Sequence, residues 1–311
     1  MIYKNALFLL VIILAFPLFG ADYYIDDIYN AEEIGRGNVE GFSTSSQGIW
    51  SNPASLKNVK NISVGLYSAK FMDSDVNYNN YTASFKLKSF KIGVGYYDVR
   101  SSDIEKNSLD DSGEAITDSS YSLSSSITKI AIQKPMKEWG SVGAALSRYK
   151  YSGYNLTGKG YGLDLGGILS IPIKKRIETI SISTTFKNII PQKVDYSNGS
   201  SEKIPSSLVL SGSVHFLQEF EAYIQRSIHF KKAQLSGVGL SYRPRFIPGR
   251  AMSFSLGRNT YFNQNDASEI HSVFSTGVGL HLLGFEFHFA YQNDPNSYSE
   301  KQFYYTSVIN F

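Results

Sequence analysis

The chain has 311 residues and is rich in tyrosine, phenylalanine and glycine, with 22, 20 and 26 of these, whereas charged residues make up only 18%. A formal net charge of +3 is too small for this length to indicate nucleic acid or a strongly acidic partner. The absence of cysteine excludes a disulfide framework and a lipid-anchored N-terminal cysteine. Backbone pairing and packing must therefore supply the stability.

Residues 1–21 have the three-part layout of a secretory signal peptide. Lys4 precedes an apolar run over residues 6–16, and the small residues Gly20 and Ala21 end the stretch. A membrane anchor is the alternative, but the apolar run is shorter than the roughly 20 residues that a spanning helix needs. We expect residues 1–21 to be a cleaved signal peptide that directs export.

Segments of about ten residues with alternating apolar and polar side chains follow from residue 61 onward. No later apolar run reaches the length of a membrane helix, so this chain can cross a membrane only as a closed barrel. The pattern predicts an all-β fold, a transmembrane antiparallel β-barrel of about fourteen strands over residues 61–311. The predicted strands are 61–70, 79–88, 90–100, 120–133, 139–150, 158–171, 177–188, 206–216, 219–230, 233–243, 250–260, 269–282, 284–293 and 301–311.

The predicted connections alternate between short and longer ones. The longest are residues 101–119, 189–205 and 259–268, and every second connection, such as Leu283-Gly284, is short. Short periplasmic turns opposite longer outer loops are typical of bacterial outer-membrane barrels. The sequence therefore predicts the outer membrane of a diderm bacterium as the location, with both termini in the periplasm.

The last strand gives the clearest assignment of faces. Phe303, Tyr305, Ile309 and Phe311 share one face, and a terminal aromatic residue resembles the signal that the outer-membrane assembly machinery reads. A Lys or Arg on the lipid face near mid-bilayer costs about 2–4 kcal/mol, so we expect the charged faces of the strands to line the lumen. The predicted lumen-lining residues are Lys86, Asp164, Lys187, Glu286 and His288. They form either a mutually paired interior or part of a route for a solute.

Arg226 departs from this rule. It shares its face with the apolar residues Phe220, Ala222 and Ile224. We therefore expect either a β-bulge near Arg226 or a side chain that extends toward the lipid headgroups.

Residues 22–60 precede the first predicted strand and are rich in small residues. Eight strands fill their own interior with side chains, whereas sixteen leave an aqueous channel, so a barrel of about fourteen needs something in its lumen to avoid being an open pore. We expect residues 22–60 to form a plug or hatch. Asn52 and Pro53 predict the turn that leads the chain into the first strand.

The stretch GRGNVEGFSTSSQGIWSNPASL at residues 35–56 resembles the N-terminal signature shared by the FadL-type long-chain fatty-acid transporters and the PorV/PorQ proteins. A weaker likeness continues through KIPSSLVLSGSVHF at residues 203–216 to the terminal Phe311. The resemblance implies a plug or hatch inside a fourteen-stranded barrel. The residues that match the signature are Gly35, Gly37, Gly41, Asn52, Pro53, Ala54 and Leu56.

Three functions follow from this resemblance as hypotheses. The first is passive transport of small hydrophobic solutes, such as long-chain fatty acids, across the outer membrane. The second is a PorV-like accessory of a protein secretion or surface-attachment machine, and the third is a structural barrel. The expected partners are outer-membrane lipids, the assembly machinery, and either a hydrophobic small molecule or secretion-system proteins.

Patterns of enzymatic or metal chemistry are weak in this sequence. Gly35-Arg36-Gly37 has no preceding strand of a βαβ unit, so a plug turn is preferred to a phosphate-binding loop. The five histidines show no close metal-ligand spacing and are interpreted as scattered strand residues. The acidic cluster in residues 110–114 is interpreted as a solvated loop rather than a calcium site. We expect no enzyme, no cofactor and no resident metal.

Overall fold

The computed structural model describes residues 30–71, 76–109, 115–136, 139–173, 177–190, 193–229, 235–262, 270–294 and 301–311. The predicted signal peptide and the acidic cluster at residues 110–114 lie outside these ranges. Among the described residues, no helix is both long and apolar enough to cross a lipid bilayer.

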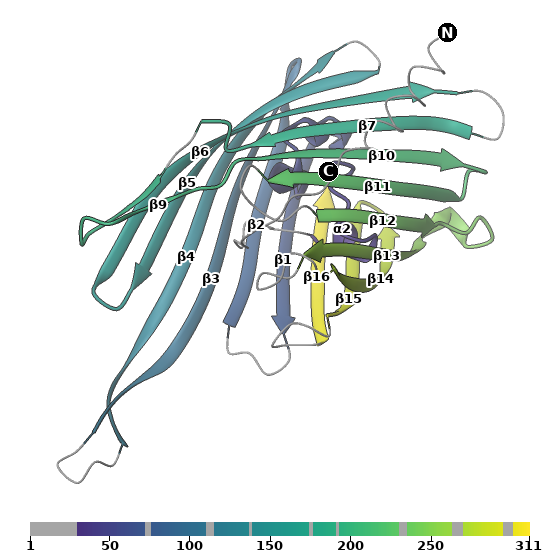
Figure 1. Cartoon of the computed structure of the whole chain (residues 1–311). Helices are drawn as coiled ribbons and strands as arrows, with labels where there is room; N and C mark the ends of the chain where they lie inside the picture. The colour runs from purple at the N-terminus through teal and green to yellow at the C-terminus, as the bar shows by residue number, and fades with distance from the viewer. Residues whose placement is uncertain are drawn as a thin grey trace.

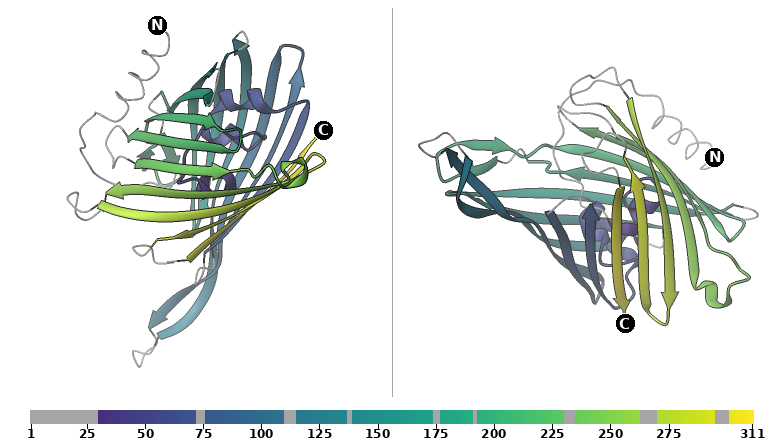
Figure 2. Two further views of the ribbon diagram at one scale, coloured as in Figure 1. Left: turned by 90° about the vertical axis from the view of Figure 1, so that its right-hand side faces the viewer. Right: turned by 90° about the horizontal axis from the view of Figure 1, so that it is seen from below.

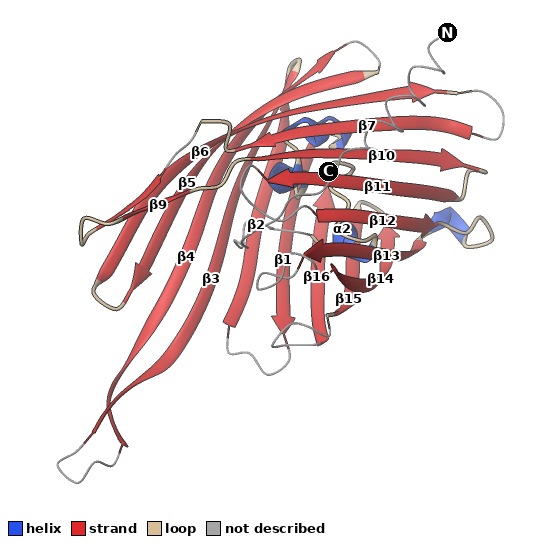
Figure 3. Cartoon of the chain, viewed as in Figure 1, coloured by secondary structure: helices blue, strands red, loops and turns tan. Residues whose placement is uncertain are grey.

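The described residues form sixteen β-strands and a few short helical segments (Figures 1 and 3). The helical segments are α2 (Ala31–Gly35), α3 (Gly48–Ser51) and the 3-10 turns η1 (Pro53–Asn58) and η2 (Pro248–Arg250). The strands are β1 (Ile62–Phe71), β2 (Val76–Leu87), β3 (Phe90–Leu109), β4 (Ala115–Met136), β5 (Gly140–Gly153), β6 (Leu156–Pro172), β7 (Ile177–Lys187), β8 (Lys193–Tyr196), β9 (Ser201–Lys203), β10 (Ser207–Phe216), β11 (Phe220–His229), β12 (Leu235–Tyr242), β13 (Met252–Phe262), β14 (Ile270–Leu282), β15 (Phe285–Asn293) and β16 (Lys301–Asn310).

Fourteen of the sixteen described strands pair into a closed antiparallel ring. The ring runs from β1 through β7 and from β10 through β16, with β7 paired to β10 and β16 paired to β1. The remaining two, β8 and β9, form a hairpin that pairs with the end of β6. Closure of the ring leaves no unpaired edge in the barrel wall, which is the condition for a sheet that lies in lipid. The predicted barrel of about fourteen strands is confirmed.

The strand faces follow the alternation in the sequence. Leu146 is 56% exposed, whereas its neighbour Ser147 is fully buried, and the same pattern repeats in other strands. Large apolar side chains that are exposed on the outer face include Leu66, Tyr81, Phe85, Val94, Ile130, Leu165, Phe186, Leu240, Leu256, Phe274 and Ile309. A continuous apolar outer surface of this kind is expected only where lipid or a partner covers it.

One expectation about an irregular segment is wrong. The stretch at residues 101–119 is not a long loop, because β3 continues to Leu109 and β4 begins at Ala115, and this hairpin extends well past the other strands (Figure 1). The polar residues there lack the apolar alternation on which the prediction depended, yet their backbones still pair. At Arg226 the first of the two alternatives is excluded, since β11 pairs in unbroken register with both of its neighbours and has no bulge there. Extension of the Arg226 side chain toward the lipid headgroups stays a prediction.

Residues 30–59 lie inside the ring (Figure 2). Residues 30–59, called the inner segment from here on, include α2, α3 and η1 and are almost entirely buried. The backbone amides of Ala31 and Ser46 donate to Thr306 Oγ1 on β16 and to Ser63 Oγ on the neighbouring strand β1. Gln225 on β11 donates to the Asn38 carbonyl, so the wall holds the segment from several directions.

Candidate functional site

Short polar side chains fold the inner segment locally. The Asn30 side chain accepts a hydrogen bond from the Glu33 amide at 2.9 Å and so caps α2 at its N-terminus. Asn52 caps η1 in the same way, because its Oδ1 accepts from the Ala54 amide at 2.8 Å and Pro53 occupies the first position of the turn. These caps help to explain why α2 and η1 form although they have only five and six residues.

Asn52 also joins the inner segment to the barrel wall. Its Nδ2 donates to Ser183 Oγ on β7 at 2.8 Å, and lies 3.3 Å from the carbonyl oxygens of Gly167 and Thr184. Gly166 on β6 has to be a glycine at this contact, because a Cβ there would lie 1.9 Å from Asn52 Oδ1. The amide of Asn52 thus serves as cap and as anchor, which gives the Asn-Pro-Ala pattern a physical reason.

Glycines on the inner segment meet glycines on the wall. Gly37 has a φ of 78°, and a Cβ on it would lie 2.3 Å from the Val238 carbonyl oxygen. Across the contact, a Cβ on Gly239 would lie 2.1 Å from the Arg36 carbonyl oxygen, and one on Gly257 would lie 1.9 Å from the Gly37 amide nitrogen. Backbone therefore packs against backbone between the segment and strands β12 and β13.

The other residues of the predicted signature are also buried against the wall. A Cβ on Gly35 would lie 2.6 Å from Ser255 Oγ, and Gly41 has a φ of 91° close to Ser183. The Ala54 carbonyl accepts from Ser141 Oγ on β5 at 2.9 Å, and Leu56 packs against the space left by Gly93. Closure of the lumen by this segment remains a prediction.

Two ion pairs occur where the inner segment meets the wall. Lys187 Nζ on β7 lies 2.8 Å from Glu40 Oε2 of the segment. Lys129 Nζ on β4 lies 2.7 Å from Asp164 Oδ2 on β6, and the same ammonium lies 5.5 Å from the centre of the Trp50 ring. Because both pairs are buried, removal of one partner would leave an uncompensated charge.

A third charged group is internal to the segment. The buried Arg36 guanidinium pairs with Glu32 at 3.2 Å and with Glu33 at 3.7 Å, and it lies 4.7 Å from the centre of the Tyr223 ring on β11. Glu33 Oε1 accepts from Ser51 Oγ at 2.9 Å. Burial raises the pKa of the Glu33 carboxyl to about 8, against the opposing effect of the Arg36 guanidinium.

An aromatic layer covers one side of the inner segment. Gly95 on β3 faces Trp50, and the next residue on the same inner face is Tyr97, whose ring lies 6.2 Å from that of Trp50. On β1, Tyr67 likewise follows Gly65 by two residues on the same face of the strand. The Tyr67 ring stacks on the Tyr304 ring, with 6.4 Å between the two ring centres. The aromatic layer consists of Trp50, Tyr67, Tyr97, Tyr304 and the partly buried Tyr78 and Tyr149, packed with Ile127. It lies toward the end of the barrel that carries the longer connections.

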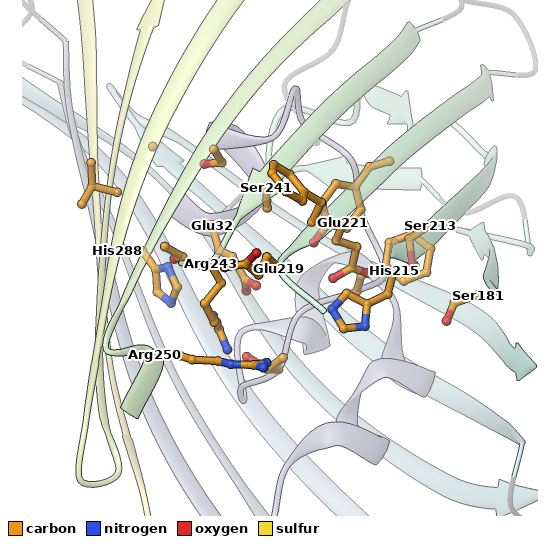
Figure 4. Close-up of a pocket in the computed structure, with 18 of the residues that line it drawn as sticks. Glu32, Ser181, Ser213, His215, Glu219, Glu221, Ser241, Arg243, Arg250 and His288 are labelled. Carbon is orange, nitrogen blue, oxygen red and sulfur yellow. The ribbon is translucent and has the colours of Figure 1, made fainter. Parts of the chain in front are cut away.

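A charged cavity lies on the other side, toward the short turns. Its volume is about 370 Å³, and Figure 4 shows ionisable side chains from several strands around it. Glu219 in the β10–β11 turn and Arg243 and Arg250 in the β12–β13 connection mark the short-turn end of the cavity. Further lining residues are Glu32, Ser181, Ser213, His215, Glu221, Ser241 and His288. The inner segment thus lies between the aromatic layer and a cavity lined by several charged side chains.

Comparisons with known proteins identify the architecture. No family model matches the sequence, and no curated protein matches it. The toluene transporter TodX of Pseudomonas putida aligns with a TM-score of 0.62 and 11% identity over 90% of this chain and 96% of that one. A FadL homologue of Pseudomonas aeruginosa aligns with a TM-score of 0.58 and 9% identity over 95% and 99%. CymD, a monoaromatic hydrocarbon channel, aligns with a TM-score of 0.56 and 15% identity over 89% and 98%.

This chain has the FadL-type barrel fold. The identities are too low to carry over any ligand residue, so the positions of the predicted lumen residues in this FadL-type barrel come from its own structure. Asp164 and Lys187 lie beside the inner segment in the two wall ion pairs. Glu286 and His288 lie together near the short-turn end, whereas Lys86 is exposed near the end of β2 and takes no part in either group.

The proposed assembly residues lie on the outer face of the last strand. Tyr305 and Ile309 are exposed on the outer face of β16, Phe303 is partly so, and Phe311 follows directly after the strand. Their role in assembly of the FadL-type barrel remains a prediction.

Sequence reasoning missed two groups of residues. The inward-facing tyrosines of the aromatic layer could be predicted from strand alternation, but their common depth depends on how far each strand is shifted along its neighbours. Trp50 lies on α3, so its place beside them depends on how the inner segment folds. The interpretation of the histidines as scattered is wrong for His281 and His288, which meet beside Glu286. The short Leu283-Gly284 turn between them was the signal, because it fixes which residues of the two strands are opposite one another.

Proposed function

We propose that this chain is an outer-membrane channel that passes small hydrophobic compounds, with the inner segment as its gate. The observation that carries the proposal is the aromatic layer directly beyond the inner segment, inside a closed barrel with an apolar outer surface. Aromatic side chains give a solute apolar contact area at little conformational cost, so this layer is the part of the lumen suited to hold an apolar molecule.

The fold comparisons support the same class of compound. The similar structures include a toluene transporter and a monoaromatic hydrocarbon channel. Monoaromatic hydrocarbons are therefore the first solutes to test, and long-chain fatty acids are the second. The charged cavity on the short-turn side suits the exit of a solute to water rather than its capture, because its lining includes several charged side chains.

Trp50 provides a direct test, because the chain has only two tryptophans. Trp139 is 53% exposed in the turn before β5 and can be replaced by phenylalanine, which leaves Trp50 in the aromatic layer as the sole reporter. Bromobenzene, a brominated hydrocarbon that quenches tryptophan on contact, should quench Trp50 of the Trp139→Phe protein in lipid nanodiscs with a saturable dependence on concentration. A brominated long-chain fatty acid tests the second class.

A matched variant separates binding from dissolved quencher. Adding Tyr97→Ser removes the ring that lies 6.2 Å from Trp50 and should weaken saturable quenching about tenfold, since the solute loses aromatic contact area. Ile132→Ser, on the outer face of neighbouring β4, should leave it unchanged. Quenching that rises linearly, or equally in both variants, would contradict a solute site in this layer.

A further inference from the structure

The β14–β15 hairpin places three metal-ligating side chains on one inner face. The two-residue turn Leu283-Gly284 sets His281 directly opposite Glu286, and Gly279 opposite His288. Glu286 and His288 are two residues apart on β15 and therefore point to the same side of the strand. A tight hairpin register, rather than a flexible loop, brings the three groups together.

Their ligand atoms lie close to one another. Glu286 Oε2 is 3.6 Å from His288 Nε2 and 3.9 Å from His281 Nδ1, and one ligand atom from each residue fits within a 4.8 Å limit. Zinc bound tetrahedrally to nitrogen at 2.0–2.1 Å holds its ligand atoms about 3.3 Å apart. Small side-chain rotations would bring all three atoms to that spacing.

The surroundings orient the three side chains. Asn310 Nδ2 donates to Glu286 Oε1 at 2.9 Å, which leaves Oε2 as the oxygen that faces the histidines. Glu286 Oε2 is buried and makes no hydrogen bond within the described part of the chain. His281 Nε2 lies 3.2 Å from Ser253 Oγ, so that Nδ1 points toward Glu286. Support of this kind from outside the ligand set is typical of metal sites.

We propose that His281 Nδ1, Glu286 Oε2 and His288 Nε2 bind a divalent transition-metal ion, with zinc as the best match. Two imidazoles and one carboxylate suit zinc and neighbouring first-row ions better than magnesium or calcium, which prefer oxygen ligands only. His288 also lines the charged cavity, so the remaining coordination position would be open to water or to an anionic group there.

The positive charge of Arg243 lies beside the proposed site and should weaken the binding of a cation there, so a variant of Arg243 tests the proposal. The Arg243 guanidinium nitrogen lies 3.0 Å from His281 Nε2, and Figure 4 shows Arg243 and His288 on the same side of the cavity. When the ion occupies Nδ1, the ring hydrogen must be on Nε2, so Arg243 has to withdraw. Arg243→Gln removes the positive charge beside the site and should strengthen zinc binding about three- to tenfold.

The experiment is calorimetric titration of zinc chloride into untagged, chelator-treated protein in detergent. We expect one zinc ion per chain, and at least about tenfold weaker binding in Glu286→Gln and in His288→Gln. His215→Gln is the matched control, because His215 lines the same cavity and pairs with Glu178 at 3.1 Å but lies outside the cluster. It should bind zinc like the parent.

Cobalt provides a second readout that does not depend on affinity alone. A parent protein loaded with Co²⁺ should show the visible absorption bands of a low-coordinate nitrogen and oxygen site, and His288→Gln should lose them. Heat-dependent gel migration checks that each variant is folded. If a ligand variant does not fold, zinc binding by Arg243→Gln is the deciding measurement, and binding no stronger than in the parent would contradict the site. Equal zinc binding in the parent, Glu286→Gln and His288→Gln, or loss of binding only in His215→Gln, would overturn the proposal.

Discussion

Asp164 makes two buried contacts, an ion pair with Lys129 and a hydrogen bond with the backbone of Asn188. Its Oδ2 pairs with Lys129 at 2.7 Å, and its Oδ1 accepts from the Asn188 amide at 2.9 Å. The two side chains are 5% and 8% exposed, so water offers little compensation if the pair is broken.

Asp164→Asn should therefore destabilise the folded barrel by about 3 kcal/mol, because the Lys129 ammonium is left buried and unpaired. The double change Lys129→Met with Asp164→Leu should recover most of that loss, since it removes both charges and keeps the volume. Urea unfolding of protein folded into vesicles measures both values. A double variant as unstable as Asp164→Asn would show that packing, and not charge, sets the cost.

Glu33 predicts a pH dependence of stability. Burial raises its pKa from 4.5 to about 8, so the unfolded chain loses this proton at lower pH than the folded one. The folded state then binds more protons between these values, and its unfolding free energy falls as pH rises from about 4.5 to 8 and levels above that.

Glu33→Gln should remove this dependence, because glutamine stays neutral. The difference in unfolding free energy between Glu33→Gln and the parent should grow in favour of the variant from pH 5 to 8 and then stay constant. Other titrating groups cancel in that difference. A difference that is the same at pH 5 and pH 8 would show that Glu33 is already ionised in the folded protein.

At the scale of elements, strands β12 and β13 approach the inner segment by backbone alone. Gly239 and Gly257 leave no room for a Cβ beside Arg36 and Gly37. This fit is a property of two elements together, since neither the wall glycines nor the segment glycines alone would create the contact.

Gly239→Ala should push the inner segment away from the wall at an overpacking cost of about 1–3 kcal/mol. Amide hydrogen exchange should then increase over residues 31–41 with little change in the barrel strands. Gly167→Ala is the matched control, because a Cβ on Gly167 meets nothing within 4 Å. Equal exchange in the two variants would mean that the segment is not held by this contact.

Strand alternation was enough to predict the ring, because a barrel wall has one apolar and one polar face along most of its length. It failed at residues 101–119, where polar residues continue the β3–β4 hairpin past the apolar wall. The partners of buried charges, such as Glu40 with Lys187, could not be predicted, since they depend on the depth at which the inner segment lies. The cluster of His281, Glu286 and His288 was within reach of the sequence, because a two-residue turn fixes the register.

At the scale of the whole molecule, we propose that the inner segment is a gate inside the closed ring. Fourteen paired strands enclose more space than their own side chains fill, and the described residues place the inner segment across that space. The wall anchors at Asn52 and Lys187 and the glycine contact at Gly239 act on different sides of the segment. Together they hold it between the aromatic layer and the charged cavity.

Single-channel conductance in planar bilayers tests whether the inner segment closes the lumen. Deletion of residues 30–48 removes α2 and the glycine contacts but keeps Asn52 and η1 as the lead into β1. Heat-dependent gel migration confirms that the shortened barrel has assembled. We predict a much larger single-channel conductance than in the intact protein, because the space across the ring becomes open to ions. An assembled, shortened barrel that conducts no more than the intact one would show that the inner segment does not close the lumen.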